Sequence, residues 1–361
     1  MKILKSIGLS VLSFLIFLAI WHLGSKALYN KAVNSTIEKI RTSQSEEAAK
    51  QTRLKILGDP EKGIPADPSS QPNSLPSPAY VWKTAKVMLK DAAQVMKDKS
   101  AFKKKMAATN KKLKAKGKPP ITYTGRPSFL DQIFTSLENI FYGVLLAICV
   151  SIPLGIMIGL SKNFRTATNW FVQVFKPISP VVWFLLVQMI VNTIMSDVDN
   201  KDEIKFYITF ISVGLCAMWA TLVNTSVGVS SVDENYLNVA KVLRLGVGKK
   251  IIKVVLPAAV PLIFTGLRIT VSVSWMVLIA VEWLSQSPGL GGFVREEFQN
   301  GSSSSNAKIM VAMFVIGVIG FFLDKLMALV QSMASFDSNQ KISLTNFGNI
   351  FTVFITKKEA A

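Results

Sequence analysis

Apolar stretches long enough to cross a lipid bilayer place the strongest limit on how this chain folds. The hydrocarbon core of a bilayer is about 30 Å thick, which corresponds to roughly 20 apolar residues in a helix. Stretches that reach or approach this length occupy residues 7–28, 136–160, 169–195, 206–224, 258–284 and 309–331. We therefore predict an all-α membrane protein with about six transmembrane helices.

Composition supports the membrane interpretation and excludes several kinds of site. Half of the 361 residues are hydrophobic, which suits an integral membrane protein better than one soluble domain. Both cysteines, Cys149 and Cys216, lie in apolar stretches, which argues against a disulfide framework or a thiolate metal site. The single histidine, His22, excludes multi-histidine metal centres and most histidine-based catalysis. The net charge is +19, but basic residues lie mainly in loops between apolar stretches, so no nucleic acid partner is expected.

Prolines and flanking charges modify three of the predicted spans. Pro177 and Pro180 fall in the third stretch and Pro153 in the second, and a proline bends a helix because it removes a backbone donor. These kinks would serve helix packing or would shape a gate. The first stretch, which follows Lys2 and Lys5, also resembles a secretory signal, but its length favours a retained anchor.

The charges of the short loops predict the orientation of the chain. Lys162 and Arg165 follow the second span, and the segment 226–257 is also rich in basic residues. The loop after the third span, SDVDNKDEI, is net acidic. Because basic loops stay in the cytoplasm, both basic loops and both chain ends are expected to be cytoplasmic. Residues 29–130 would then be extracytoplasmic, which the rule permits because long loops cross the membrane largely regardless of charge.

This topology divides the chain into four parts. They are an N-terminal transmembrane helix at 1–28, a basic insertion at 29–130, a transmembrane core at 131–335 and a cytoplasmic tail at 336–361. Within the insertion, helices are expected at 31–57 and 80–116, on either side of a linker at 58–79 that is rich in proline and polar residues. The lysine-rich run 102–118 is either a solvated helix face or a docking surface for an acidic partner.

A patterned polar segment, SSVDENYLNVAKVLRLGVGKKIIKVVLPAAVP at 230–261, separates the fourth and fifth spans. Ser231 and Glu234 have the spacing of a capping box, which predicts that a helix begins there. The apolar stripe of this helix, at steps of three and four residues, comprises Tyr236, Val239, Ala240 and Leu243. Glycines at 246 and 248 would end the helix with a positive φ, and a second short basic helix at 249–256 would lead to Pro257. The stripe is too short to cross the bilayer, so it must be buried against lipid, this chain or another protein.

The same segment resembles the signature of permease subunits of ATP-binding-cassette (ABC) importers, which is Glu-Ala-Ala, three residues, Gly, nine residues, Ile, one residue, Leu-Pro. Ala240, Leu256 and Pro257 match this signature. The departures are Asn238 and Val239 at the first two positions, Arg244 at the glycine position and Val254 at the isoleucine position.

Flanking stretches resemble the nitrate, sulfonate and taurine permease group, and most closely its nitrate, cyanate and bicarbonate branch. They are LPSPAYVW at 75–82, SLENIFYGVLLAICVSIPLGIMIGL at 136–160, KPISPVVWFLLVQMIV at 176–191, FTGLRITVSVSWMVLIAVEWL and GLGGFVREEFQNG. The resemblance covers residues 120–335 and, more loosely, the first span.

The resemblance implies a type I importer permease in which the segment 230–257 holds a coupling helix for a separate cytoplasmic ATPase. The residues implied to contact that ATPase are Tyr236, Leu237, Ala240, Leu243, Gly246 and Pro257. ATP and Mg²⁺ would bind the ATPase, because this chain lacks a Gly-x-x-x-x-Gly-Lys-Ser/Thr phosphate loop, and no cofactor of its own is expected. The implied partners are an ATPase dimer, an extracytoplasmic solute-binding protein and a second copy of the chain, within the lipid of a bacterial inner membrane. The implied cargo is nitrate, nitrite, cyanate or bicarbonate, and the chain itself would not be an enzyme.

Other interpretations of the sequence stay open. The cargo would instead be taurine, an alkanesulfonate or another small organic solute. A structural membrane anchor or receptor with a basic docking loop is a different class of function, and neighbouring genes for an ATPase and a binding protein would argue against it. A channel or secondary transporter is a further alternative, which ATP-dependent uptake would exclude.

Ionisable residues within membrane spans are costly and usually face protein or water. Arg268 is interpreted either as a structural residue or as a contact for a small planar oxyanion, and Glu282 as a gate or a helix-bonding residue. Asp324 is expected to pair with the adjacent Lys325 or to lie near the membrane surface. The candidate residues of a translocation pathway, each with helix packing as its alternative, are Arg268, Ser274, Trp275 and Glu282.

Overall fold

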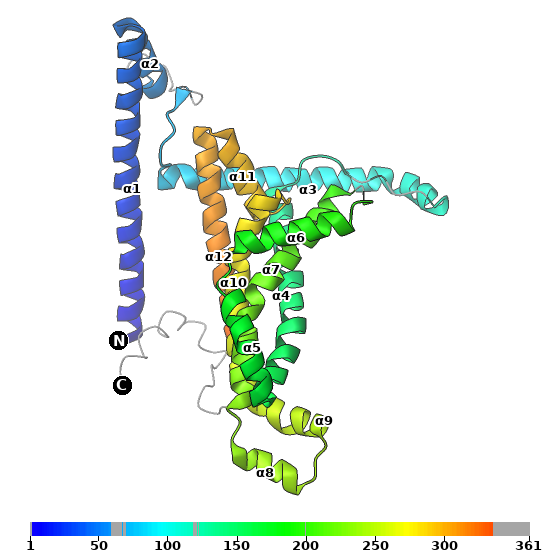
Figure 1. The fold of residues 1–361 in the computed structure, drawn as a ribbon. Coiled ribbons are helices and arrows are strands. Elements are labelled where there is room, and N and C mark those ends of the chain that lie inside the picture. The colour runs from blue at the N-terminus through cyan, green and yellow to red at the C-terminus, as the bar shows by residue number, and fades with distance from the viewer. Residues whose placement is uncertain are drawn as a thin grey trace. The chain divides into compact units, whose positions relative to one another are not determined.

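The computed structural model describes residues 2–58, 67, 70–117, 121, 123–198 and 200–334, and within these ranges the regular structure is helical. The all-α class predicted from the sequence is confirmed. Figure 1 shows the helices α1 to α12 in the colours of their order along the chain. The predicted C-terminal tail, 336–361, and residues 59–66, 68 and 69 of the predicted linker lie outside the described residues.

The chain forms two compact units, which we describe separately. Among the described residues, unit 1 lies within 2–94 and 296–314, and unit 2 lies within 95–295 and 315–334. The helices that contribute residues to both units are α3 (Pro78–Ala115), α11 (Leu290–Asn300) and α12 (Ser303–Ala334). All the candidate site residues belong to unit 2.

In unit 1, α1 (Lys2–Ser43) is one uninterrupted helix that continues beyond the predicted end of the first span at residue 28. The predicted start of a separate helix at residue 31 was wrong. No proline or glycine interrupts residues 29–43, so the helix continues into the polar sequence. The next helix, α2 (Glu46–Leu57), packs back against α1 and begins where the Ser45 hydroxyl accepts a hydrogen bond from the Ala48 N–H at 3.2 Å. The first part of the insertion is therefore a helical hairpin.

Residues 71–77 of unit 1 are irregular, as expected for the end of the linker, but hydrogen bonds attach them to α1. The Tyr29 hydroxyl donates to Gln71 Oε1 at 2.7 Å. Trp21 Nε1 donates to the carbonyl oxygen of Pro76 at 3.1 Å. These two bonds fix the path of the chain between the hairpin and the start of α3.

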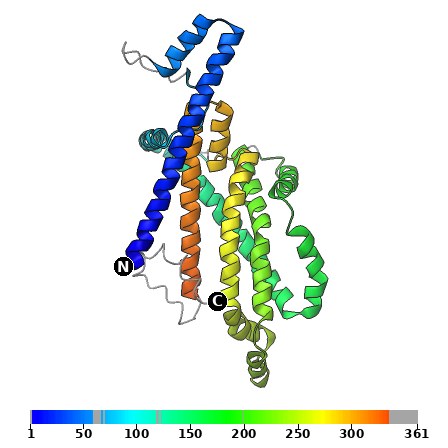
Figure 2. The same cartoon turned by 90° about the vertical axis from the view of Figure 1, so that its left-hand side faces the viewer.

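In unit 2, α7 (Lys201–Ser230) contacts both α4 (Phe129–Leu160) and α10 (Leu256–Ser285), and these three helices form the centre of a membrane bundle. Figure 2 shows α7 and α10 side by side along their length. Small residues permit the close approach of α4 and α7, since a Cβ atom added to Gly155 would lie only 2.7 Å from Thr225 Cβ. Between α7 and α10, the hydroxyls of Thr221 and Thr270 approach to 2.7 Å.

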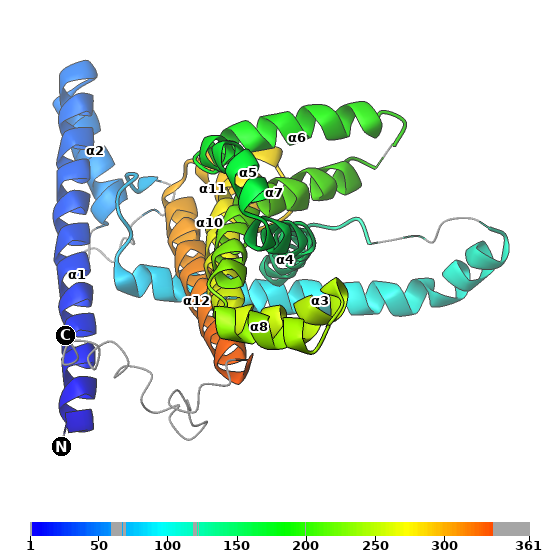
Figure 3. The same cartoon turned by 60° about the horizontal axis from the view of Figure 1, so that its bottom comes forward.

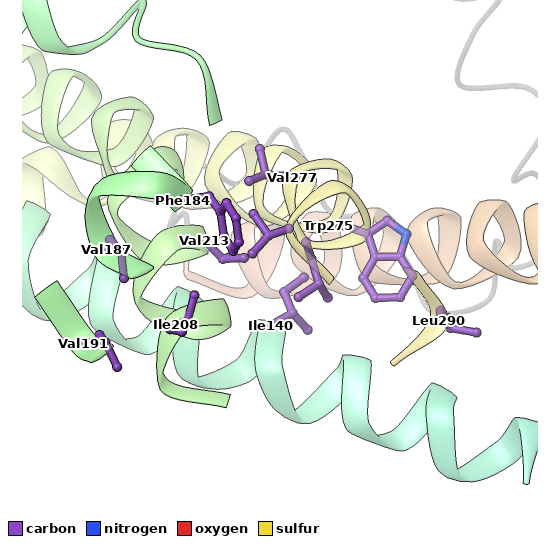
Figure 4. Close-up of a cluster of buried hydrophobic side chains, with 11 residues drawn as sticks. Ile140, Phe184, Val187, Val191, Ile208, Val213, Trp275, Val277 and Leu290 are labelled. Carbon is purple, nitrogen blue, oxygen red and sulfur yellow. The ribbon is translucent and has the colours of Figure 1, made fainter. Parts of the chain in front are cut away.

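A buried apolar cluster joins α4, α6 (Pro180–Ile194), α7, α10 and the start of α11 at one end of this bundle. Its members are Ile140, Phe184, Val187, Val191, Ile208, Val213, Trp275, Val277, Leu278, Val281 and Leu290. Figure 4 shows side chains of this cluster and the separate helices from which they come. In lipid, such helices associate through close packing and dispersion contacts rather than by removal of surface from water. The cluster therefore holds α10, which carries the four candidate pathway residues, in a fixed position.

The predicted third span, 169–195, is two helices rather than one. α5 (Lys162–Phe175) and α6 meet at an angle of 98°. Pro177 and Pro180 explain the break, because proline lacks the N–H group that would continue the helix, and Ser179 caps the new helix at Val181. The predicted kink is confirmed, and the single span is corrected to a broken pair. Among the described residues, five helices are long and apolar enough to cross a membrane, or six if this pair is one span.

Candidate functional site

The segment between α7 and α10 contains a short helix, α8 (Glu234–Val242), which lies across one end of the bundle (Figure 3). Asp233 begins this helix, because its side chain accepts a hydrogen bond from the Asn235 N–H at 2.8 Å. The predicted capping box of Ser231 and Glu234 was wrong. The Ser231 hydroxyl donates instead to the carbonyl oxygen of Gly228 at 3.1 Å and so completes the end of α7.

The apolar residues of α8 divide into two faces rather than forming one stripe. Ala240 is 1% exposed, and Leu237 is half-buried against a cluster formed by α7, η2 and α10. Tyr236, Val239 and Leu243, which we call the α8 outer face, are 57–64% exposed. The buried face attaches α8 to this chain, and the outer face is available to a partner. Ala240 therefore contacts its own chain, which corrects the expectation that it lies on the partner-facing stripe.

In the turn after α8, the residue with a strained backbone is not one of the predicted glycines. Arg244 has a φ of +48°, in the left-handed region that costs a residue with a side chain roughly 1–2 kcal/mol. Gly246 has a φ of −63°, and Gly248 lies within α9 (Val247–Lys250), so neither supplies the positive φ predicted for a glycine. Arg244 stands at the glycine position of the signature that this segment resembles. The backbone at this position thus has a conformation that suits glycine although the residue is arginine.

The predicted second short helix, 249–256, is not separate from the fifth span. α9 begins after Gly246 and continues through a π-helical turn, η2 (Ile251–Val255), into α10. Pro257 lacks the N–H group that would complete the α-helical hydrogen bond to the carbonyl of Lys253, which accounts for the wider turn. One continuous helix of 39 residues, Val247–Ser285, therefore connects the turn after α8 to the far end of the bundle.

Arg268 of α10 forms a two-pronged ion pair with Asp324 of α12. The Nε and Nη2 atoms of Arg268 donate to Asp324 Oδ1 and Oδ2 at 2.7 and 2.8 Å, a geometry in which such pairs are strong. The two side chains are 40% and 34% exposed, so the pair is open to one side. The predicted pairing of Asp324 with Lys325 was wrong, because adjacent helix residues point about 100° apart. Lys325 Nζ lies instead 5.4 Å from the centre of the Phe321 ring.

The ion pair lies in a groove of about 520 Å³ between α10 and α12. The other side chains that line it are Thr265, Ile269, Ser272, Val273, Met276 and Gln331. The Asp324 carboxylate engages Nε and Nη2 of Arg268, and among the described residues none accepts a hydrogen bond from Nη1. The groove can therefore offer guanidinium donors to a small anion while the pair as a whole stays neutral.

Glu282 of α10 is fully enclosed, with 0% exposure. The Ser136 hydroxyl lies 2.8–2.9 Å from its two carboxylate oxygens, and Asn139 Nδ2 and the Gly291 N–H donate to them at 3.1 and 3.0 Å. A Cβ atom on Gly289 would overlap the carboxylate, so the loop before α11 can approach only with glycine there. These contacts bond α10 to α4 and to α11, and they give Glu282 a helix-bonding role.

Ser274 and Trp275 are packed within the bundle rather than beside the groove. Trp275 is 6% exposed, its Nε1 donates to the carbonyl oxygen of Ile316 at 3.0 Å, and its ring contacts Gly320. Ser274 is 0% exposed, and its hydroxyl has no hydrogen-bond partner within the described part of the chain. Of the candidate pathway residues, the fold brings Arg268 to an open groove and encloses the other three.

Sequence reasoning missed the partners of both charged residues of α10. Asp324 is 56 residues away from Arg268, and Ser136 is 146 residues away from Glu282, so no local spacing connects them. The available signal was weaker: a cation and an anion in two membrane spans tend to pair with each other. That signal favours the pairing of Arg268 with Asp324, but it does not identify the uncharged donors around Glu282.

Comparisons with known proteins place these features in a family. The model of a family described as "Binding-protein-dependent transport system inner membrane component" matches residues 151–333, a range that includes α8, the Arg268–Asp324 pair and Glu282. The chain is 32% identical over 204 residues to the nitrate import permease protein NrtB of Synechococcus elongatus, covering 56% of this chain and 69% of that protein. It is 33% identical over 201 residues to the bicarbonate transport system permease protein CmpB of the same organism, covering 55% of this chain and 67% of that protein.

Proposed function

The chain belongs to the family of binding-protein-dependent transport system inner membrane components, and from this premise we propose that it forms the membrane pathway for a small planar oxyanion. It is a multi-pass inner-membrane permease subunit of an ABC importer, and therefore a transport component rather than an enzyme. Members of this family work with a separate ATPase and with a solute-binding protein.

The proposed cargo is a singly charged oxyanion of the nitrate or bicarbonate class. The names of the two relatives refer to nitrate and to bicarbonate, which share a flat arrangement of three oxygen atoms around one central atom. A guanidinium group matches this shape, because its N–H donors lie in one plane and can bond two oxygens at once. The position of Arg268 in an open groove of a membrane helix is the observation that carries the proposal.

Asp324 would partly balance the charge of Arg268, so that the site binds the anion without holding it too firmly for release. An unpaired guanidinium within the membrane is costly, and a pathway site that holds its ion too firmly slows the release of that ion. The neutral pair reduces both difficulties, because the carboxylate occupies Nε and Nη2 while the anion approaches Nη1 from the groove. Ser272 lines the same groove and offers a hydroxyl to a second oxygen atom of the anion.

In the proposed mechanism, ATP hydrolysis acts on this pathway through α8. The α8 outer face would bind a dimer of the ATPase, and the ATPase would hold ATP and Mg²⁺. Leu237 and Ala240 attach α8 to the bundle, so a displacement of α8 would move the continuous helix Val247–Ser285 with it. A second copy of this chain would close the groove from its open side.

The proposal is tested with the importer, its ATPase and its binding protein in liposomes, by ATP-dependent uptake of isotopically labelled nitrate and bicarbonate. The variant Arg268→Gln/Asp324→Asn removes both charges while it keeps the site neutral. We expect it to assemble normally and to lose at least about tenfold in uptake rate, equivalent to ~1.4 kcal/mol.

The matched control is Lys325→Gln, which removes a neighbouring charge that lies against Phe321 outside the groove, and it should transport like the wild type. Unchanged uptake by the double variant would contradict the role of the groove. Uptake of taurine but of neither planar anion would contradict the proposed cargo.

A further inference from the structure

The second half of α3, residues 95–115, is linked to the start of α4 by an ion pair and to the connecting segment at Ile121 by hydrogen bonds. Lys99 Nζ lies 2.5 Å from Asp131 Oδ2 in the first turn of α4. Asn110 forms two hydrogen bonds with the backbone of Ile121, in which its Nδ2 donates at 3.0 Å and its Oδ1 accepts at 2.8 Å. This part of the basic insertion is therefore an ordered helix with a defined inner side.

The side of this helix opposite to the inner side is exposed and strongly basic. The residues that face inward recur at steps of three and four positions and are Val95, Lys99, Phe102, Met106, Asn110 and Leu113. The exposed lysines, which we call the lysine face, are Lys97, Lys103, Lys104, Lys105, Lys111, Lys112 and Lys114. The only acidic residue within 95–117 is Asp98, so the lysine face has a single sign of charge.

A helix surface that only needs to be solvated does not require charges of a single sign. Like charges one turn apart weaken a helix by a few tenths of a kcal/mol per pair, and acidic residues among the lysines would relieve that cost. A partner surface with carboxylates would relieve the same repulsion and would be attracted from a distance. The pattern therefore fits an anionic partner.

The composition of the lysine face favours a soluble acidic protein over a lipid surface. A helix that binds a membrane surface inserts a row of large apolar side chains into the boundary of the acyl region. Within residues 95–117, Met96 is the only large apolar side chain that is exposed. The lysine face thus has charge for attraction but no apolar row for insertion.

The position of the lysine face indicates which protein would bind it. Lys99 is bonded at the first turn of α4, whereas Leu237 of α8 packs against the same buried cluster as Ile152 and Ile156, which lie near the other end of α4. The lysine face and the α8 outer face therefore lie at opposite ends of the bundle of unit 2. Because the ATPase is expected at α8, the opposite end is the one that a solute-binding protein reaches.

We propose that the lysine face is a docking surface for an acidic patch on the solute-binding protein, an inference that rests on the proposed function. Attraction between exposed charges acts mainly on the rate of encounter, and it is screened beyond about 10 Å at 0.1 M salt. The lysine face accordingly guides the loaded binding protein to the outer end of the importer and contributes little to how long it stays.

The test measures the association rate of the binding protein with the complete importer in nanodiscs of zwitterionic lipid, without any transport. The binding protein used is the one that stimulates ATP hydrolysis by the wild-type importer. The lysine variant carries Lys103→Gln, Lys104→Gln, Lys105→Gln, Lys111→Gln and Lys112→Gln. The control variant removes five exposed charges from the α1–α2 hairpin, with glutamine at Lys31, Lys39, Lys50, Arg53 and Lys55.

We expect the lysine variant to associate about tenfold more slowly than the wild type at low salt, with an unchanged dissociation rate and no difference at about 1 M salt. The control variant should associate like the wild type. Equal slowing of both variants, or of neither, would overturn the proposal. So would a difference that is confined to nanodiscs of anionic lipid, which would assign the lysines to headgroups. Normal docking on an importer that moves neither planar anion would contradict the proposed cargo and leave the docking surface intact.

Discussion

Two charged side chains of α10 show two ways of keeping an ionisable group within a membrane helix. Glu282 is fully enclosed, and uncharged donors from α4 and α11 surround its carboxylate. Arg268 lies on the same helix, but a single opposite charge balances it and it stays 40% exposed in a groove. The enclosed carboxylate is bonded through both oxygens and is sealed from ligands, whereas the guanidinium retains donors on an open surface. The enclosed charge of Glu282 therefore joins helices, whereas the exposed charge of Arg268 can bind cargo.

Removal of the enclosed carboxylate should have the largest effect. Glu282→Ala would leave the Ser136 hydroxyl, the Asn139 amide and the Gly291 N–H without an acceptor, and each such buried group costs about 1–3 kcal/mol. We expect a loss of about 3–5 kcal/mol in stability and little protein in the membrane. The measurements are membrane abundance and the thermal unfolding midpoint in detergent.

Glu282→Gln is the matched control, because the amide keeps the shape of the side chain and one acceptor oxygen. We expect this variant to be intermediate between the wild type and Glu282→Ala. Equal stability of the alanine and glutamine variants would mean that the carboxylate does not hold the helices together, and the comparison with Arg268 would lose its basis.

Breaking the open pair should cost less stability than breaking the enclosed site. Asp324→Ala leaves Arg268 uncompensated, and we expect a loss of about 3 kcal/mol, at the low end of the range for such groups because the pair is partly exposed. The exchanged variant Arg268→Asp/Asp324→Arg restores a pair and should recover abundance. It should not recover uptake, because the guanidinium then projects from α12. Full recovery of anion uptake by the exchanged variant would reduce the pair to a link between helices.

The same contrast between open and enclosed residues recurs on α8. Tyr236→Glu places a charge on the α8 outer face, and we expect the ATPase to bind about 30-fold more weakly, equivalent to ~2 kcal/mol, with normal abundance of the permease. Ala240→Glu buries a carboxylate inside this chain and should instead lower its abundance. Co-purified ATPase per molecule of permease separates the two outcomes. Full retention of the ATPase by Tyr236→Glu would exclude the outer face as the contact.

The smallest expected effect concerns the turn after α8. Arg244→Gly should stabilise the chain by about 1 kcal/mol, because glycine adopts a positive φ without the steric cost that a Cβ atom brings. Arg244→Ala removes the same charge but keeps the Cβ atom, so its unfolding midpoint should stay near that of the wild type. Equal midpoints for the glycine and alanine variants would show that the conformation of Arg244 carries no strain.

The features that the sequence predicted correctly depend on local properties of the chain. Hydropathy over about 20 residues located the spans at α7, α10 and α12, and Pro177 and Pro180 predicted a kink where the structure has the break between α5 and α6. The apolar steps of three and four residues from Tyr236 to Leu243 predicted the helix that the structure shows as α8. Length, proline content and apolar periodicity can each be read from neighbouring residues, which is why these predictions were confirmed.

The features that the sequence could not supply depend on contacts between distant residues. The stripe of α8 contained Ala240, but only the packing of α8 on the bundle shows that this residue is enclosed while Tyr236 is open. Charge alone placed Arg268 and Glu282 in one class of pathway residue, and their different surroundings come from α4, α11 and α12. Helical periodicity identifies which residues share a face, but it does not identify what covers that face.

The π-helical turn η2 sets the angular phase of α10 relative to α8. A π-turn absorbs about one more residue than an α-helical turn, and each residue of an α-helix advances the chain by about 100° around the axis. If Ile251–Val255 wound as a regular α-helix, every residue after it would be rotated by about 100°, and Arg268 would no longer be directed at Asp324. One wide turn, which lies beside α8 and outside the groove, thus keeps the wall of the groove in register with the surface assigned to the ATPase.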